Sequence, residues 1–258
     1  MKIYVLVKEV PDTYGDRKLD LETGLADRAA GDVVLDEITE RALEVALTYA
    51  DKNAGTEVVA LSMAPESSTA SVRRALAIGA GSAVHVVDEQ LRGADLSLTA
   101  ETLAAAVRRG EPDLVITGNL STDGSGGVIP AMLAEHLGYA QATALSAVDI
   151  SADGVSGTRA ADDGAQQVSA SYPAVISITE ALPDARFPNF KGIMAAKKKP
   201  LEVLSLADLG VSADPAEAPR TIMTAVSEKP PRAAGVKITD EGDAATQLVE
   251  FLAQNRLV

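Results

Sequence analysis

One stretch near the middle of the chain reads Leu-Val-Ile-Thr-Gly-Asn-Leu-Ser-Thr-Asp-Gly-Ser-Gly-Gly, from Leu114 to Gly127, and an amphipathic run to Leu137 follows. An apolar run, a glycine-rich turn and a helix start are typical of a strand–loop–helix unit. Backbone N–H groups in such a loop, with the positive end of the helix dipole, form a natural anion site. The stretch lacks the Lys-Ser/Thr of a P-loop and the G-x-G-x-x-G spacing of a dinucleotide fingerprint. On its own it fits two interpretations, an anion site and a plain connector.

Strand and helix patterns alternate before this stretch. Short apolar runs predict buried strands at residues 2–7, 57–62, 83–87 and 113–117. Helices are expected between them, and the clearest one follows Asp36, a natural N-cap, and places on one face Ile38, Ala42, Val45 and Tyr49. The alternation predicts an α/β fold with a doubly wound, mostly parallel sheet. Ligands bind such sheets beyond the carboxyl ends of the strands, where the glycine-rich stretch lies.

The pattern changes after Gly138. Two short runs, 155–159 and 167–172, flank Asp162-Asp163-Gly164 and predict a β-hairpin, and residues 174–178 predict the last core strand. Residues 201–258 hold few core-forming runs, and only 244–257 has a helical pattern. Such a segment buries too little apolar surface to fold alone. We therefore predict an α/β domain over residues 1–200 and an extended C-terminal arm over 201–258 that wraps a partner subunit.

Composition narrows the function further. A formal net charge of −14 argues against nucleic acid as a partner, because phosphates would repel the chain. The chain has no cysteine and only two histidines, which argues against disulfides, iron–sulfur clusters and thiolate or all-histidine metal sites. No apolar run approaches the roughly 20 residues of a transmembrane helix, and the N-terminal apolar run is too short for a signal peptide. A cytoplasmic protein is expected.

Three segments carry a family pattern. Near its N-terminus the chain reads Lys8-Glu9-Val10-Pro11-Asp12-Thr13, and Arg186 to Pro200 ends in a basic run. Between Gly157 and Ser177 stand, at fixed spacing, Arg159, Asp162-Asp163-Gly164, Gln166, Val168, Pro173 and Val175-Ile176-Ser177. In these segments the chain resembles the β subunit of electron transfer flavoproteins, in a bacterial, actinobacterial-like branch. The resemblance covers essentially the whole chain.

The resemblance implies both a fold and a function. The fold would be adenine-nucleotide alpha-hydrolase-like, and the chain would pair with an electron transfer flavoprotein α subunit that holds most of an FAD. The heterodimer would take electrons from dehydrogenases, such as acyl-CoA dehydrogenases, and pass them to a membrane quinone oxidoreductase. The β subunit would be a carrier with no catalysed reaction of its own and would hold a structural AMP.

The resemblance also implies the site residues. The AMP region maps onto Leu6, Val33, Asp36, Met63, Gly118, Asn119, Ser121, Thr122, Asp123, Gly124, Ser125, Gly126, Gly127, Val128 and Ile129. Some relatives have Asn-Pro where this chain has Val33-Val34, and Asn or Gln at Gly127 and Val128, so here the loop would rely on backbone donors. Asp123 would orient the loop or contact the ribose, or it would be an ordinary turn residue. Thr13 and Leu35 map near the expected FAD.

A dehydrogenase-docking loop maps onto residues 182–194. Its exposed anchor falls on Phe190, with Ile193 and Arg186 as further docking residues, whereas Phe187 is expected in the core. The alternative is that these aromatic side chains cover the edge of the sheet. Lys197-Lys198-Lys199 would steer an acidic partner or would be a solvated charge run.

Rival functions remain on the same fold. A stand-alone ATP- or AMP-binding regulator, or an adenylylating enzyme, would be a monomer with exchangeable ATP. A structural homodimer would bind neither nucleotide nor flavin. A carrier of the bifurcating type would hold a second FAD in place of AMP.

Overall fold

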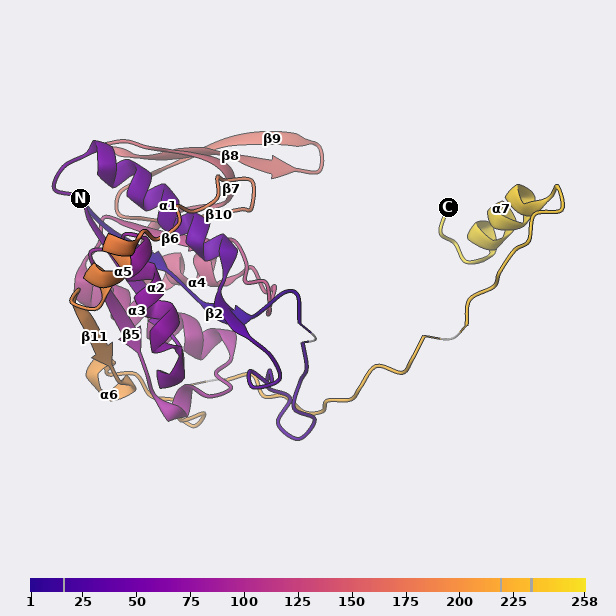
Figure 1. Ribbon diagram of the computed structural model, residues 1–258, viewed down its shortest axis with the longest axis horizontal. Helices are drawn as coiled ribbons and strands as arrows, with labels where there is room; N and C mark the ends of the chain where they lie inside the picture. Colours follow the sequence, from indigo (N-terminus) through magenta and orange to yellow (C-terminus); the bar gives the residue numbers. More distant parts are fainter. Residues whose placement is uncertain (16, 219, 233) are drawn as a thin grey trace. The chain divides into compact units, whose positions relative to one another are not determined.

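The computed structural model describes residues 1–15, 17–218, 220–232 and 234–258 (Figure 1). The chain divides into two compact units, Met1–Thr224 and Ala225–Val258. The first unit contains the sheet and every helix except α7 (Ala244–Gln254), which belongs to the second.

A large sheet organises the first unit. Within the described residues it has nine strands in the order β11-β5-β4-β1-β6-β10-β7-β8-β9. Its parallel part consists of β1 (Lys2–Leu6), β4 (Glu57–Met63), β5 (Ser82–Val86), β6 (Leu114–Gly118), β10 (Ala174–Ile178) and β11 (Leu201–Leu204), together with β7 (Ala140–Ile150) alongside β10. The chain moves outward from β1 through β4 to β5 and then crosses to β6 on the other side of β1. The predicted doubly wound α/β fold is therefore confirmed, with the switch point between β1 and β6.

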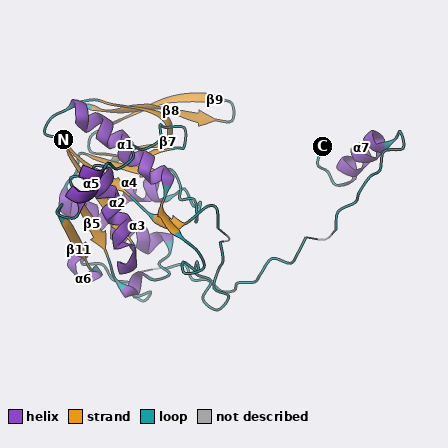
Figure 2. Ribbon diagram, viewed as in Figure 1, coloured by secondary structure: helices purple, strands orange, loops and turns teal. Residues whose placement is uncertain are grey.

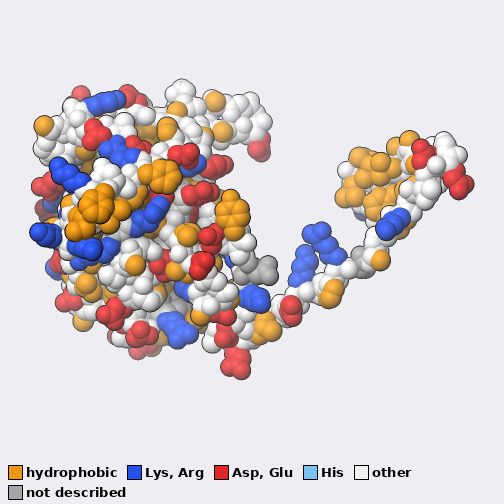
Figure 3. All heavy atoms as spheres, in the orientation of Figure 1, with side chains coloured by type: hydrophobic (Ala, Val, Ile, Leu, Met, Phe, Trp, Pro, Cys, Tyr) orange, Lys and Arg blue, Asp and Glu red, His pale blue; other side chains and the backbone are white. Residues whose placement is uncertain are grey.

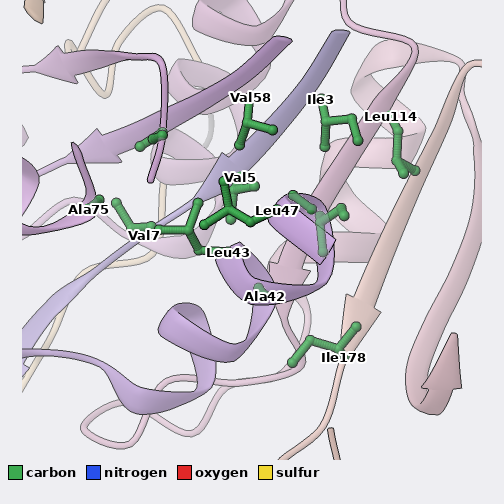
Figure 4. Packing of buried hydrophobic residues seen from close by; sticks show 14 of the residues in the cluster. Ile3, Val5, Val7, Ala42, Leu43, Leu47, Val58, Ala75, Leu114 and Ile178 are labelled. Carbon is green, nitrogen blue, oxygen red and sulfur yellow. The ribbon is translucent and has the colours of Figure 1, made fainter. Parts of the chain in front are cut away.

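Helices cover both faces of this sheet. One face packs against α1 (Glu37–Lys52) and α2 (Thr69–Ile78), where Val5, Leu43 and Leu76 belong to one buried apolar cluster (Figure 4). The other face packs against α3 (Leu96–Gly110) and α4 (Ile129–Leu137). Shorter helical elements are η1 (Glu66–Ser68), η2 (Glu89–Leu91), α5 (Phe190–Ala196) and α6 (Leu206–Leu209). Because both faces are covered, the central parallel strands β1, β4, β6 and β10 are mostly apolar and buried, as the sequence predicts.

An antiparallel ribbon completes the sheet beyond β10. The strand β7 pairs with β8 (Gly154–Ala161), and β8 pairs with β9 (Gly164–Ser171), which forms the predicted hairpin at the sheet edge (Figure 2). The strand β7 is not among the predicted elements, because its Ala, Gln and Ser residues alternate without a strong apolar face. A separate two-stranded ribbon joins β2 (Glu9–Pro11) to β3 (Val33–Leu35).

The boundary of the first unit lies later than the predicted residue 200. Residues 201–204 form β11, which pairs in parallel with β5, and Leu204 and Leu206 are buried. The segment Leu-Glu-Val-Leu is short and contains the charged Glu202, so its pattern alone does not indicate a buried strand, but an edge strand needs only one covered face. The second unit contains α7, on which three large apolar side chains, those of Leu248, Val249 and Phe251, are exposed. Wrapping of a partner by this segment remains a prediction.

Candidate functional site

The glycine-rich loop lies at the switch point of the sheet. It follows β6, and residues Val7 and Lys8 follow the neighbouring strand β1. The loop begins with Asn119, whose N–H donates to the carbonyl of Ile178 at the end of β10, 2.8 Å away. The carboxyl ends of β1, β6 and β10 thus converge on the position where doubly wound sheets bind ligands.

Asp36 joins this loop to helix α1. Its side chain is fully buried, and Oδ1 accepts from the Ile38 N–H at 3.1 Å, so that Asp36 caps α1 as predicted. Its other oxygen, Oδ2, accepts from the Thr122 N–H at 2.8 Å and from Thr122 Oγ1 at 3.2 Å. One carboxylate therefore fixes both the helix start and the middle of the loop.

Lys8 and Asp123 form a second connection, between β1 and the loop. Lys8 Nζ lies 2.7 Å from Asp123 Oδ1 and donates to Ser121 Oγ at 3.1 Å. Arg28 Nη2 lies 3.6 Å from Asp123 Oδ2. Burial alone would raise the pKa of Asp123, but the hydrogen bonds from Lys8, Ser121 and the Gly124 N–H bring the pKa below its usual value. Asp123 is thus an ionised group that holds the loop and partly neutralises the cations beside it.

The N-terminus of α4 keeps donors that the loop does not use. The N-cap residue Val128 makes no side-chain capping bond within the described residues, so the first N–H groups of α4 have no side-chain acceptor there. Gly127 has φ +68°, a left-handed conformation that favours glycine. Asn119 Oδ1 is buried and has no hydrogen-bond partner in the described part of the chain. These groups suit a small anionic ligand that also carries a donor.

The other predicted nucleotide residues lie in different surroundings. Leu6 is buried in the core, and Met63 packs against the same apolar cluster. Val33 and Leu35 line a cavity of about 520 Å³ whose other walls come from α1 and α2, formed by Glu40, Ala70, Ser71 and Arg74. Thr13 is exposed in a turn. The structure thus brings together Asp36 and the loop residues from 118 to 129, and it places Leu35 in the core at 5% exposure.

Sequence reasoning missed the basic side chains of the site. Lys8, Arg28 and Arg17, which donates to the Thr122 carbonyl, all contact the loop. A signal was present for Lys8, because a charged residue directly after a buried strand at the switch point faces the ligand edge. Arg28 and Arg17 come from a polar segment whose path no periodicity indicates.

The predicted docking segment exposes two aromatic side chains. Phe190 is 79% exposed at the start of α5, and Ile193 and Met194 are about half exposed. Phe187 is 89% exposed, so its predicted place in the core is wrong. Figure 3 shows apolar side chains gathered over α5, with Lys and Arg side chains beside them.

Arg186, a predicted docking residue, forms ion pairs within the chain, and its contact with a partner stays a prediction. Its guanidinium lies 2.8 Å from Glu44 Oε1 and 2.9 Å from Asp51 Oδ2, both on α1. Its Nε and Nη2 donors are therefore used within the chain, and the neighbouring aromatic side chains are the most exposed contact groups of the segment.

Comparisons with known proteins agree with this architecture. The family model described as "Electron transfer flavoprotein domain" matches residues 23–209. A protein named electron transfer flavoprotein subunit beta, from Mycobacterium tuberculosis, is 46% identical over 99% of each chain. The chain belongs to the electron transfer flavoprotein family. A β subunit from Syntrophomonas wolfei is 32% identical over 98% of this chain and 96% of the relative. The Caffeyl-CoA reductase-Etf complex subunit CarD of Acetobacterium woodii is 32% identical over 82% of this chain and 81% of its own.

As an electron transfer flavoprotein subunit, the chain is a carrier rather than an enzyme with its own reaction, as predicted. Similarity to β subunits over the full length implies an α subunit as its partner. Within the described residues, no helix is both long and apolar enough to cross a bilayer. The donors at the N-terminus of α4 and the Asn119 oxygen are groups that a ligand with a phosphate and a hydrogen-bond donor would need.

Proposed function

We propose that this chain is the β chain of an FAD-containing heterodimer that shuttles electrons from dehydrogenases, such as acyl-CoA dehydrogenases, to a membrane quinone oxidoreductase. Full-length similarity to a β subunit from Mycobacterium tuberculosis carries this proposal. The Acetobacterium woodii relative is named as part of a complex with a reductase of a coenzyme A thioester, which supports an oxidoreductase partner. FAD, held mainly by the α subunit, would supply the redox chemistry, and this chain would supply binding surfaces.

AMP would bind at the glycine-rich loop. Backbone N–H groups from Gly126 to Ile129 would hold its phosphate at the α4 N-terminus, where the helix dipole favours negative charge. Asp36 and Lys8 would keep the loop in place through their contacts with Thr122 and Asp123. Asp123 would stay clear of the phosphate, since two negative charges repel each other.

The α subunit would cover helix α7. This helix carries Leu248, Val249 and Phe251 exposed, and none of its residues is buried. Contiguous apolar side chains on an amphipathic helix are typical of a surface that a partner covers. An α subunit with an apolar groove is the occupant that the family implies.

Co-expression with the α chain tests the proposal. The expected product is a yellow heterodimer with one flavin, and mass spectrometry of the ligands released on denaturation is expected to find AMP. A colourless monomer with exchangeable ATP would support the nucleotide-binding regulator instead. Two flavins per heterodimer would identify a bifurcating carrier, and a homodimer without ligands would refute the proposal.

Substitution on α7 tests the interface. Leu248→Asp is expected to weaken heterodimer formation strongly, because a buried unpaired carboxylate is costly. Gln254→Asp on the same helix adds the same charge without removing an apolar group, and it serves as the control. Equal heterodimer yields for the two variants would contradict this interface.

A further inference from the structure

Arg186 is clamped to helix α1 through several hydrogen bonds. Its backbone N–H donates to Glu44 Oε2 at 3.0 Å, its Nε donates to the same oxygen at 2.8 Å, and its Nη2 donates to Glu44 Oε1 at 2.8 Å. Nη2 also donates to Asp51 Oδ2 at 2.9 Å. The Glu44 side chain is only 16% exposed. This fork geometry fixes both the side chain and the backbone immediately before Phe187.

A second attachment lies just before the clamp. Arg41, also on α1, donates to the carbonyl of Leu182 and pairs with Asp184. Two arginine side chains therefore attach the segment from Leu182 to Arg186 to α1. Arg41 belongs to α1, and Arg186 belongs to the segment itself. Because these contacts lie within the chain, they hold the segment in place before a partner binds.

Helix α5 is held just as firmly at its own ends. Asn189 Oδ1 accepts from the Gly192 N–H at 2.8 Å and caps its start. Arg73 Nη1 donates to the carbonyls of Ala196 and Lys199, at 2.8 and 2.9 Å, and caps its end. Lys199 Nζ in turn donates to the carbonyls of Leu76 and Ala80, at 2.9 and 2.6 Å, at the end of α2.

Helices α2 and α5 also approach closely between these caps. A Cβ added at Gly192 would lie 2.6 Å from the carbonyl oxygen of Ala77 on α2, which no side chain tolerates without movement. Gly192 therefore allows α5 to rest directly on α2. Phe187, 89% exposed, lies between the Arg186 clamp and α5, and Phe190, 79% exposed, is the first residue of α5.

A segment whose aromatic side chains are already held in place loses less conformational entropy when a partner binds. Ordering a loop and its side chains on association carries an unfavourable entropic cost for each side chain that is immobilised. A segment already ordered before binding avoids that cost, and its affinity is higher for the same contacts. Aromatic side chains in fixed positions are the groups that dominate interface energies.

We propose that Arg186 is a positioning residue for docking, which acts through its clamp on Glu44 and does not touch the partner. The clamp presents Phe187 and Phe190 together as one docking surface. The inference rests on the proposed function, because it assumes a dehydrogenase as the partner. Lys191, Lys197 and Lys198 are exposed around this surface, so the partner is expected to offer an apolar socket bordered by carboxylates.

Steady-state kinetics of the purified heterodimer tests the inference. In the assay an acyl-CoA dehydrogenase reduces the heterodimer, and the heterodimer concentration is varied to give KM and kcat. Reduction by dithionite, which requires no docking, serves as the control for flavin content. Arg186→Gln and Glu44→Gln are each expected to raise KM about tenfold with little change in kcat. The double variant is expected to behave as either single variant, because the residues act as a pair. Arg186→Lys keeps the charge without the fork and is expected to fall between.

Further variants distinguish a failure of the positioning role of Arg186 from a failure of the proposed docking. Arg109→Gln removes an exposed ion pair with Glu202 elsewhere on the surface and is expected to leave KM unchanged. Gly192→Ala leaves the clamp intact but moves α5 away from α2, and it is expected to raise KM as well. If Phe190→Ala raises KM while the clamp variants and Gly192→Ala do not, the positioning role is refuted and docking stands. If Phe187→Ala and Phe190→Ala also leave KM unchanged, the proposed docking itself fails. Should Arg186→Gln not fold, Glu44→Gln, which removes the same clamp from the α1 side, decides by the same criterion.

Discussion

Replacing Asp36 by alanine is expected to destabilise the first unit and to release the nucleotide loop together. The substitution removes the side-chain cap of α1, which costs about 1 kcal/mol. It also removes the hydrogen bonds of a buried carboxylate with the Thr122 N–H and Oγ1, at 2.8 and 3.2 Å, which adds about 2 kcal/mol. The sum, about 3 kcal/mol, corresponds to a fall in Tm of about 6–12 °C for a unit of this size.

Thermal unfolding of the heterodimer, followed by circular dichroism, measures the effect. Asp36→Asn preserves the shape but removes the charge, so it is expected to lose about half as much. Thr122→Ala removes only the 3.2 Å hydroxyl bond and is expected to cost least. The nucleotide retained after gel filtration is expected to fall in the same order, Asp36→Ala below Asp36→Asn below Thr122→Ala. A Tm for Asp36→Ala within about 2 °C of the unsubstituted protein would refute the reasoning, because it would mean that none of the three hydrogen bonds contributes.

Three other substitutions test separate features. Lys8→Met leaves the Asp123 carboxylate without its 2.7 Å partner, and it is expected to lower the nucleotide content measured by mass spectrometry and to raise the pKa of Asp123 measured by NMR. Gly157→Ala places a Cβ inside contact distance of the Ala147 carbonyl oxygen in β7, and it is expected to cost about 1–3 kcal/mol in denaturant unfolding; an unchanged midpoint would count against the β7–β8 register. Burial lowers the pKa of His85, so the unfolded chain takes up the proton first as pH falls, and the free energy of unfolding decreases below about pH 6.5. His85→Leu is expected to reduce this pH dependence of stability between about pH 7.5 and 5.5. An unaltered pH dependence would show that His85 is not its source.

The sequence predicts the parallel sheet well because both of its faces are covered. Continuous apolar strands and one-sided helices report burial directly, and Asp36 stands where a helix cap should. The strand β11 and the long strand β7 escaped prediction for the opposite reason. Each has only a partial apolar pattern, and its place depends on neighbours distant in the chain.

The candidate sites were predictable in location but not in contacts. The loop after β6 lies at the ligand edge as expected, whereas its link to Asp36 joins residues 86 positions apart. Arg186 and Phe187 show the same limit. Nothing in the local sequence indicates that Arg186 binds Glu44 and Asp51, on a helix far earlier in the chain, or that the next residue, Phe187, is exposed.

The position of β10 in the sheet affects how the chain assembles as it is synthesised. The strands β5, β4, β1 and β6 can pair before β10 exists, and the β7–β8–β9 ribbon precedes β10 in the chain. Within the described residues, β10 is the only strand that pairs both with β7 of that ribbon and with β6 of the strands made earlier. A nascent chain that ends at Ser171 therefore holds two sheet fragments with no backbone pairing between them. Loss of β11 trims one edge, whereas loss of residues 174–178 divides the sheet in two.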